Sequence, residues 1–94
     1  MLFLVCYDLA KPEETPKDYN DLIAELETSY PEYYHLQNSV WVIATKDATG
    51  AVRDKLCSSV PNGAYLLVAR FTGWQSWNLN PNAAEWLHAH KDEL

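Results

Sequence analysis

The stretch that decides the fold is Met1–Asp8, M-L-F-L-V-C-Y-D, which is apolar for seven residues and then ends on a carboxylate. Successive side chains of a strand point to opposite faces, so positions 3, 5 and 7 share one face and positions 2, 4 and 6 the other. Both sets are apolar, and a strand of this kind must be covered on both faces. The stretch therefore predicts a central strand, with Asp8 emerging at its C-terminal end, where sites in open α/β sheets tend to form.

Two helices are predicted further along the chain. The first begins with Thr15 as N-cap and Pro16 at the first helical position, and Pro31 ends it. The second follows Asp47 or Thr49 as a cap and stops before 61–63, Pro-Asn-Gly. Each carries apolar residues at helical spacing. These stripes are Tyr19, Leu22, Ile23, Leu26 and Tyr30 in the first helix, and Val52, Leu56 and Val60 in the second.

Three further strands are predicted from β-branched and aromatic content, at residues 32–37, 39–45 and 64–71. The first two are joined by a turn at 37–39 and should form a hairpin. Residues 73–80 have no regular pattern. Asn80 and Pro81 then mark the cap and first position of a last helix.

The order strand, helix, strand, strand, helix, strand is the ferredoxin-like pattern, so we predict one α+β domain over residues 1–94 with a C-terminal extension and a short helix. Right-handed crossovers place both main helices on one face and make the first and third strands the central pair. The other face then needs a cover. We expect the C-terminal segment and a second copy of the chain to supply it. The expected contact surface of this homodimer is Phe3, Val5, Tyr7, Trp41, Trp74 and Trp77.

Composition limits the classes of partner. Thirteen acidic and seven basic residues give a formal net charge of −6, and the basic residues are scattered. A protein that neutralises phosphates normally carries a basic patch, so the charge disfavours nucleic acid. No run reaches membrane-spanning length, and no basic n-region precedes the first strand. We therefore expect a cytoplasmic protein with two reduced, buried thiols, Cys6 and Cys57, in which the terminal Lys-Asp-Glu-Leu is not read as a retention signal.

Several motifs together resemble a known family. The strand ending in Tyr7-Asp8-Leu9 and followed by Lys11-Pro12 resembles the opening of SinR-like small proteins. The hairpin over residues 33–41, Y-Y-H-L-Q-N-S-V-W, is similar to their aromatic-aromatic-His hairpin, and residues 51–56 and 86–87 resemble their second and terminal helices. These proteins belong to the wider family of the second CRISPR-associated protein, the small dimeric subunit of the spacer-integration complex.

The resemblance implies a ferredoxin-like homodimer in which Asp8 lies near its symmetry mate. In that family the matching carboxylates have been proposed to hold a divalent metal for phosphodiester cleavage, so Asp8 would be both metal ligand and catalytic residue, with Mg²⁺ or Mn²⁺ as cofactor. The chain departs from the pattern after the first strand. The loop there carries Glu13 and Glu14 beside Lys11 and Lys17 instead of a basic run.

Each candidate residue also has a purely structural interpretation. Asp8 could cap a loop at the end of its strand. His35, beside two tyrosines, is a candidate general acid or base, or a hairpin residue paired with a neighbour. His88 and His90 are two apart and do not share a helix face, so we expect no metal site from that pair. The chain contains no motif for nucleotide hydrolysis, for zinc-dependent proteolysis or for a serine hydrolase.

Three functions are compatible with these patterns, and whether the protein is an enzyme stays open. The first is a non-catalytic dimeric module that binds a protein partner. The second is a Mg²⁺-dependent ribonuclease or deoxyribonuclease that uses Asp8. The third is an acidic surface that imitates nucleic acid and inhibits another protein. The acidic residues of that surface would be Glu13, Glu14, Asp18, Asp21, Glu25 and Glu32.

Overall fold

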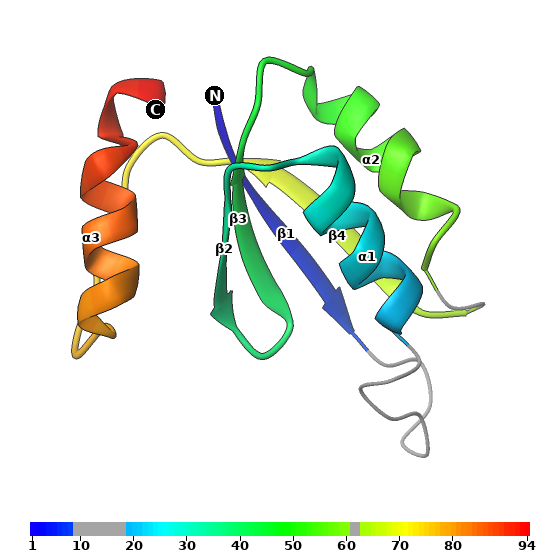
Figure 1. The fold of residues 1–94 in the computed structure, drawn as a ribbon, viewed down its shortest axis with the longest axis horizontal. Helices are drawn as coiled ribbons and strands as arrows, with labels where there is room; N and C mark the ends of the chain where they lie inside the picture. The colour runs from blue at the N-terminus through cyan, green and yellow to red at the C-terminus, as the bar shows by residue number, and fades with distance from the viewer. Residues whose placement is uncertain (9–18, 61–62) are drawn as a thin grey trace.

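The computed structural model describes residues 1–8, 19–60 and 63–94. Their order along the chain is strand, helix, two strands, helix, strand, helix and a final 3₁₀ turn (Figure 1). The strands are β1 (Leu2–Asp8), β2 (Tyr33–Gln37), β3 (Val40–Ala44) and β4 (Tyr65–Arg70). The helices are α1 (Asn20–Ser29), α2 (Thr49–Cys57), α3 (Pro81–Ala89) and the 3₁₀ turn η2 (Lys91–Glu93).

The four strands form one antiparallel sheet in the order β2-β3-β1-β4. Val5 of β1 lies between Trp41 of β3 and Val68 of β4. The prediction that the first and third strands are central is therefore confirmed. An α+β class and a hairpin between β2 and β3 are confirmed with it.

The helices α1 and α2 cover one face of the sheet, as Figure 1 shows. They bury the predicted stripe residues Leu22, Leu26, Val52 and Leu56 completely. Side chains of the sheet complete this core: Phe3, Val5, Tyr7, Trp41 and Ile43. Alternate side chains of β1 thus pack against the apolar stripes of the two helices, as the periodicity of their sequences predicts.

Four residues of the expected dimer surface belong to the helix-covered core, so the expectation is wrong for them. Phe3, Val5, Tyr7 and Trp41 point toward α1 and α2 and are at most 6% exposed, so another copy of the chain cannot touch them. Both faces of β1 are apolar, and the alternation alone does not say which one the helices cover. A contact surface on the second face would use the other set of positions.

The second face is covered only in part. Leu2 and Val42 are fully buried there, while Leu4 and Cys6 are half-buried. The helix α3 and the segment before it form a hollow with this face, between Leu4, Leu36 and Leu87. Trp74 and Trp77 also line the hollow, and Trp77 is 91% exposed. The C-terminal segment thus supplies one part of the cover that was expected.

The start of α3 follows the prediction closely. Asn80 is its N-cap, Pro81 is its first residue, and the Asn80 side chain accepts a hydrogen bond of 2.8 Å from the backbone N–H of Asn82. The start of α2 does not. Ala48 is the N-cap there, and no side chain caps the helix.

Neither predicted cap is at the N-cap position, because Asp47 precedes Ala48 and Thr49 is the first residue of the helix. The Asp47 carboxylate instead accepts a 3.4 Å hydrogen bond from the Tyr30 hydroxyl and lies 3.9 Å from the Lys55 ammonium. The predicted start of the first helix at Thr15 and Pro16 lies outside the described residues. Within the described part, α1 begins at Asn20 after Tyr19.

Cys6 and Cys57 are both free, but Cys57 is exposed, so the expectation of two buried thiols is wrong for it. It lies beside the stripe of α2, whose buried residues are Val52 and Leu56.

None of the described helices combines the length and apolarity that crossing a membrane requires.

Candidate functional site

Asp8 lies where the sequence places it, exposed at the C-terminal end of β1 and opposite Tyr65 of β4. Its position in the strand puts it on the second face, in line with Leu4 and Cys6. It borders a shallow hollow of about 400 Å³. The other residues that line the hollow are Cys6, Tyr7, Ser39, Val40, Tyr65, Leu66 and Leu67.

The lining of this hollow is mostly apolar. Tyr65 and Leu67 expose 67% and 61% of their surface, large fractions for such side chains. Burial raises the pKa of the Cys6 thiol, so this group stays protonated and is a poor nucleophile near neutral pH. The chemistry at this place is therefore one carboxylate at the border of an apolar surface.

His35 lies apart from Asp8. Its ring stacks on Trp41, with centroids 4.3 Å apart, and its Nε2 lies 3.0 Å from the carbonyl oxygen of Asn38. In the sheet, His35 is opposite Trp41 and Trp41 is opposite Val5, so His35 belongs to the helix-covered face. The pleat therefore places the two predicted catalytic residues on opposite faces of the sheet. The contacts of His35 are those of a hairpin residue paired with its neighbours.

Beneath His35 lies a buried polar contact. The indole Nε1–H of Trp41 donates a 3.0 Å hydrogen bond to the Tyr7 hydroxyl. Burial raises the pKa of Tyr7, and the hydrogen bond from Trp41 opposes this in part. A protonated, enclosed hydroxyl of this kind holds the core together and has no access to a substrate.

The acidic residues considered for nucleic-acid imitation do not form one described surface. Glu13, Glu14 and Asp18 lie outside the described residues. Glu25 accepts a 2.7 Å hydrogen bond from the Ser29 hydroxyl, while the Glu32 carboxylate lies 3.2 Å from Nε2 of His90.

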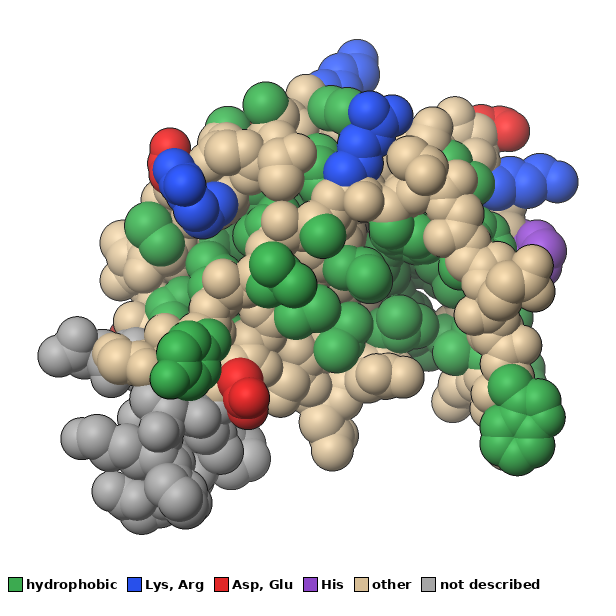
Figure 2. Space-filling model, turned by 180° about the vertical axis from the view of Figure 1, so that it is seen from behind, with side chains coloured by type: hydrophobic (Ala, Val, Ile, Leu, Met, Phe, Trp, Pro, Cys, Tyr) green, Lys and Arg blue, Asp and Glu red, His purple; other side chains and the backbone are tan. Residues whose placement is uncertain are grey.

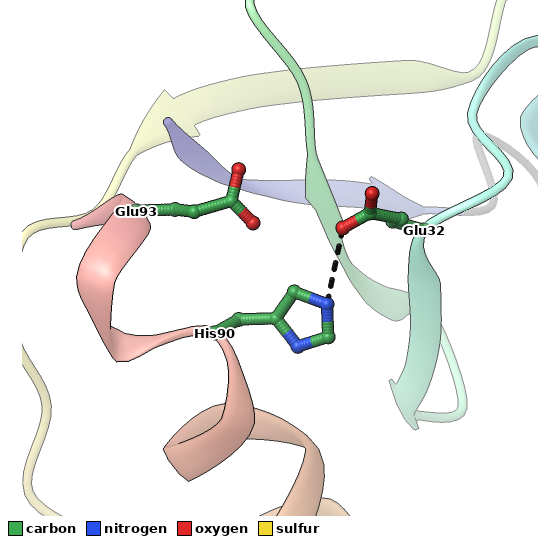
Figure 3. A group of neighbouring side chains, drawn as sticks. All are labelled: Glu32, His90 and Glu93. Atoms are coloured by element: carbon green, nitrogen blue, oxygen red, sulfur yellow. Dashed lines mark hydrogen bonds and ion pairs between the residues drawn. The ribbon is translucent and has the colours of Figure 1, made fainter.

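A second group of polar side chains lies where the start of β2 meets α3 and η2, and the sequence patterns do not indicate it. Glu32 precedes β2, His90 follows α3 and Glu93 belongs to η2 (Figure 3). One ligand atom from each lies within 4.8 Å of the other two. Glu32 and His90 are 58 residues apart in sequence, so no local spacing connects them. The sequence shows His90 and Glu93 close together near the C-terminus, but its local pattern does not connect them with Glu32.

Searches against models of protein families, curated proteins and solved structures found no match to this chain. The resemblance to SinR-like proteins and to the integration subunit therefore stays a prediction.

Proposed function

We propose that this protein is a non-catalytic binding module with a ferredoxin-like fold that forms a homodimer through the uncovered part of its second sheet face. The observation that supports this most directly is the exposure of Tyr65 and Leu67 beside Leu4, Cys6 and Val40. Figure 2 shows hydrophobic side chains gathered over the middle of the molecule on the side away from the view of Figure 1. We call Leu4, Cys6, Val40, Tyr65 and Leu67 the β4 patch.

The strand order β2-β3-β1-β4 and the placement of α1 and α2 on one face support the ferredoxin-like assignment. Such an arrangement leaves a sheet face open, and here α3 covers the end away from Asp8. A contiguous apolar patch beside polar groups is typical of an interaction site.

A second copy of the chain is the partner that explains the β4 patch most simply. In a two-fold pair, the same patch of each copy is buried at once. Burying a side chain such as Leu67 contributes roughly 1.5–3 kcal/mol, and both copies gain it. The net charge of −6 disfavours phosphate-rich partners, and the resemblance to a dimeric family supports the homodimer.

Sedimentation and light scattering over a dilution series test the homodimer. We expect the wild type to change from dimer to monomer on dilution. Leu67→Glu should shift this midpoint to at least about tenfold higher concentration, since 1.4 kcal/mol corresponds to tenfold. The matched control is Ala51→Glu, which adds the same charge at an exposed position on α2 and should leave the midpoint unchanged. A wild type that is monomeric at every concentration, or equal effects of both variants, would refute the proposal.

One observation favours a second function, a Mg²⁺-dependent nuclease. Asp8 borders the hollow that the β4 patch lines, so a two-fold pair formed by this patch with its axis near Asp8 would bring the two Asp8 carboxylates together. Two carboxylates can share a hard cation that polarises a phosphodiester and activates water. His35, on the other face, takes no part in this chemistry.

The nuclease function is tested with single-stranded RNA and DNA in the presence of Mg²⁺ or Mn²⁺ and of a chelator. Cleavage that needs the metal, disappears in Asp8→Asn and persists in Asp21→Asn would establish it. Asp21 is an exposed carboxylate on α1 and serves as the control for lost charge. Absence of cleavage by the wild type, or equal cleavage by Asp8→Asn, would leave the binding module as the function.

A further inference from the structure

The C-terminal end of the chain meets the start of β2 through three ligand-type side chains, Glu32, His90 and Glu93. Figure 3 shows the imidazole and the two carboxylates converging on one space. His90 Nε2 lies 3.2 Å from a carboxylate oxygen of Glu32. None of the three residues belongs to the β4 patch, so the site does not rest on the proposed homodimer.

The hydrogen bonds of His90 define its tautomer. Its Nδ1 lies 2.8 Å from the carbonyl oxygen of Trp86. A carbonyl only accepts hydrogen bonds, so Nδ1 carries the hydrogen and donates it. In the neutral ring, Nε2 then carries a lone pair, and this lone pair faces the Glu32 carboxylate. Two acceptors at this distance repel each other unless a positive species lies between them or is bound to one of them.

A divalent metal ion bound to Nε2 can be that positive species, and Glu93 brings a second carboxylate into the same space. The His90 ring is already fixed, because it stacks on Trp86 with centroids 3.8 Å apart and its side chain is only 19% exposed. A histidine that donates Nδ1–H to a backbone carbonyl is the arrangement that orients metal-ligating histidines.

We propose that Glu32, His90 and Glu93 bind a divalent transition-metal ion of the Zn²⁺ type. One imidazole nitrogen and two carboxylate oxygens suit Zn²⁺, whose fourth position a water molecule would occupy. Bonds of roughly 2.0–2.1 Å put tetrahedral ligands about 3.4 Å apart. The present spread of up to 4.8 Å needs only a small movement of the ligand side chains. Mg²⁺ prefers an all-oxygen octahedral site and should not compete.

The bound ion would tie η2 and the end of α3 to the start of β2. The Trp86 ring already approaches Tyr34 of β2, with centroids 6.5 Å apart. The metal would therefore act as a clasp between the C-terminal segment and the sheet.

Zn²⁺ binding to the full chain, measured near neutral pH by competition with a chromophoric chelator, tests the site. We expect one ion per chain in the wild type. Each of three variants, Glu32→Gln, Glu93→Gln and His90→Gln, should weaken binding by about 10–100-fold or more. Loss of an outer-shell partner of a metal ligand already has an effect of that size. The matched controls are Asp92→Asn and His88→Gln, which remove an exposed carboxylate and an exposed imidazole nearby and should leave affinity unchanged.

Imidazole nitrogen NMR spectra of the wild type supply a readout that does not depend on any variant. Zn²⁺ should move the Nε2 resonance of His90 and leave those of His35 and His88 in place, and Mg²⁺ should move none of them. The proposal would be overturned if the wild type does not bind Zn²⁺, if the His90 resonance does not respond, or if Asp92→Asn weakens binding as much as Glu93→Gln.

Discussion

At the scale of single residues, the hydrogen bond between Trp41 and Tyr7 shows how burial increases the contribution of a polar contact to stability. Both side chains are nearly fully buried, and the Tyr7 hydroxyl accepts the hydrogen bond of the Trp41 indole. A buried donor that loses its acceptor costs its full desolvation free energy. A tyrosine whose hydroxyl contacts solvent has no such effect.

We therefore expect Tyr7→Phe to lower the free energy of unfolding by about 1–3 kcal/mol. The matched variant is Tyr33→Phe, which removes an exposed hydrogen bond to Glu27 and should change stability by less than about 0.5 kcal/mol. Urea unfolding followed by tryptophan fluorescence measures both. Equal losses in the two variants would show that the Trp41 donor does not depend on Tyr7.

Asp8 and His35 show what a residue pattern can predict about the place of a side chain on the sheet and what it cannot. The run of apolar residues in β1 places Asp8 at an exposed strand end, and the structure agrees. A linear pattern does not show that His35 belongs to the opposite face, because this depends on two registers, that of His35 against Trp41 in the hairpin and that of Trp41 against Val5 of β1. The group that the structure assembles instead, at Glu32 and His90, has no local signature.

At the scale of secondary structure, the start of α3 is the helix boundary that the sequence indicates best. Its N-cap uses a side chain that is adjacent in sequence to the group it satisfies, so the geometry is local. The helix packs against the sheet through few buried residues, chiefly Ala83 and Leu87. Its stability should therefore be sensitive to the cap.

We expect Asn80→Ala to destabilise α3 by about 1 kcal/mol, because the backbone N–H of Asn82 loses its acceptor. The control is Asn82→Ala, which keeps that backbone N–H and changes only an exposed side chain. Amide hydrogen exchange should increase within α3 for the first variant, with the amides of β1 little affected. The same increase for Asn82→Ala would contradict the role of the cap.

The start of α2 illustrates the opposite case. Asp47 is a predicted cap, but it lies one residue before the N-cap Ala48, and its carboxylate contacts Tyr30 and Lys55. Tyr30 follows α1 and lies 17 residues earlier in the chain. A tertiary contact thus overrides the local preference, and only the packed structure shows it.

At the scale of the whole molecule, the same contact should make global stability depend on pH. Burial is the main cause that raises the pKa of Tyr30 to about 12, and the nearby Asp47 charge adds to it. The phenol of an unfolded chain titrates near pH 10. Between these values the unfolded state loses its proton first, so the free energy of unfolding decreases as pH rises.

We expect the stability that Tyr30 contributes to be complete below pH 10 and to be lost progressively as pH rises toward 12. The loss should be about 1–2 kcal/mol, less than the full linkage value, because the Asp47 side chain that contributes to the shift is 40% exposed to solvent. Urea unfolding across this window measures it. Tyr30→Phe should show a shallower decrease, and an unchanged slope in that variant would assign the effect to other tyrosines.

The sequence by itself determined the order of elements, the central position of β1 and β3, the core stripes of α1 and α2, and the cap of α3. These follow from the periods of strand and helix and from side chains that act on adjacent backbone groups. The tertiary structure alone decided which apolar face of β1 the helices cover, how much of the second face α3 covers, and that Glu32 meets His90. Those outcomes depend on the path of the chain between distant segments, because two apolar faces are equivalent in a pattern and become different only when the elements pack.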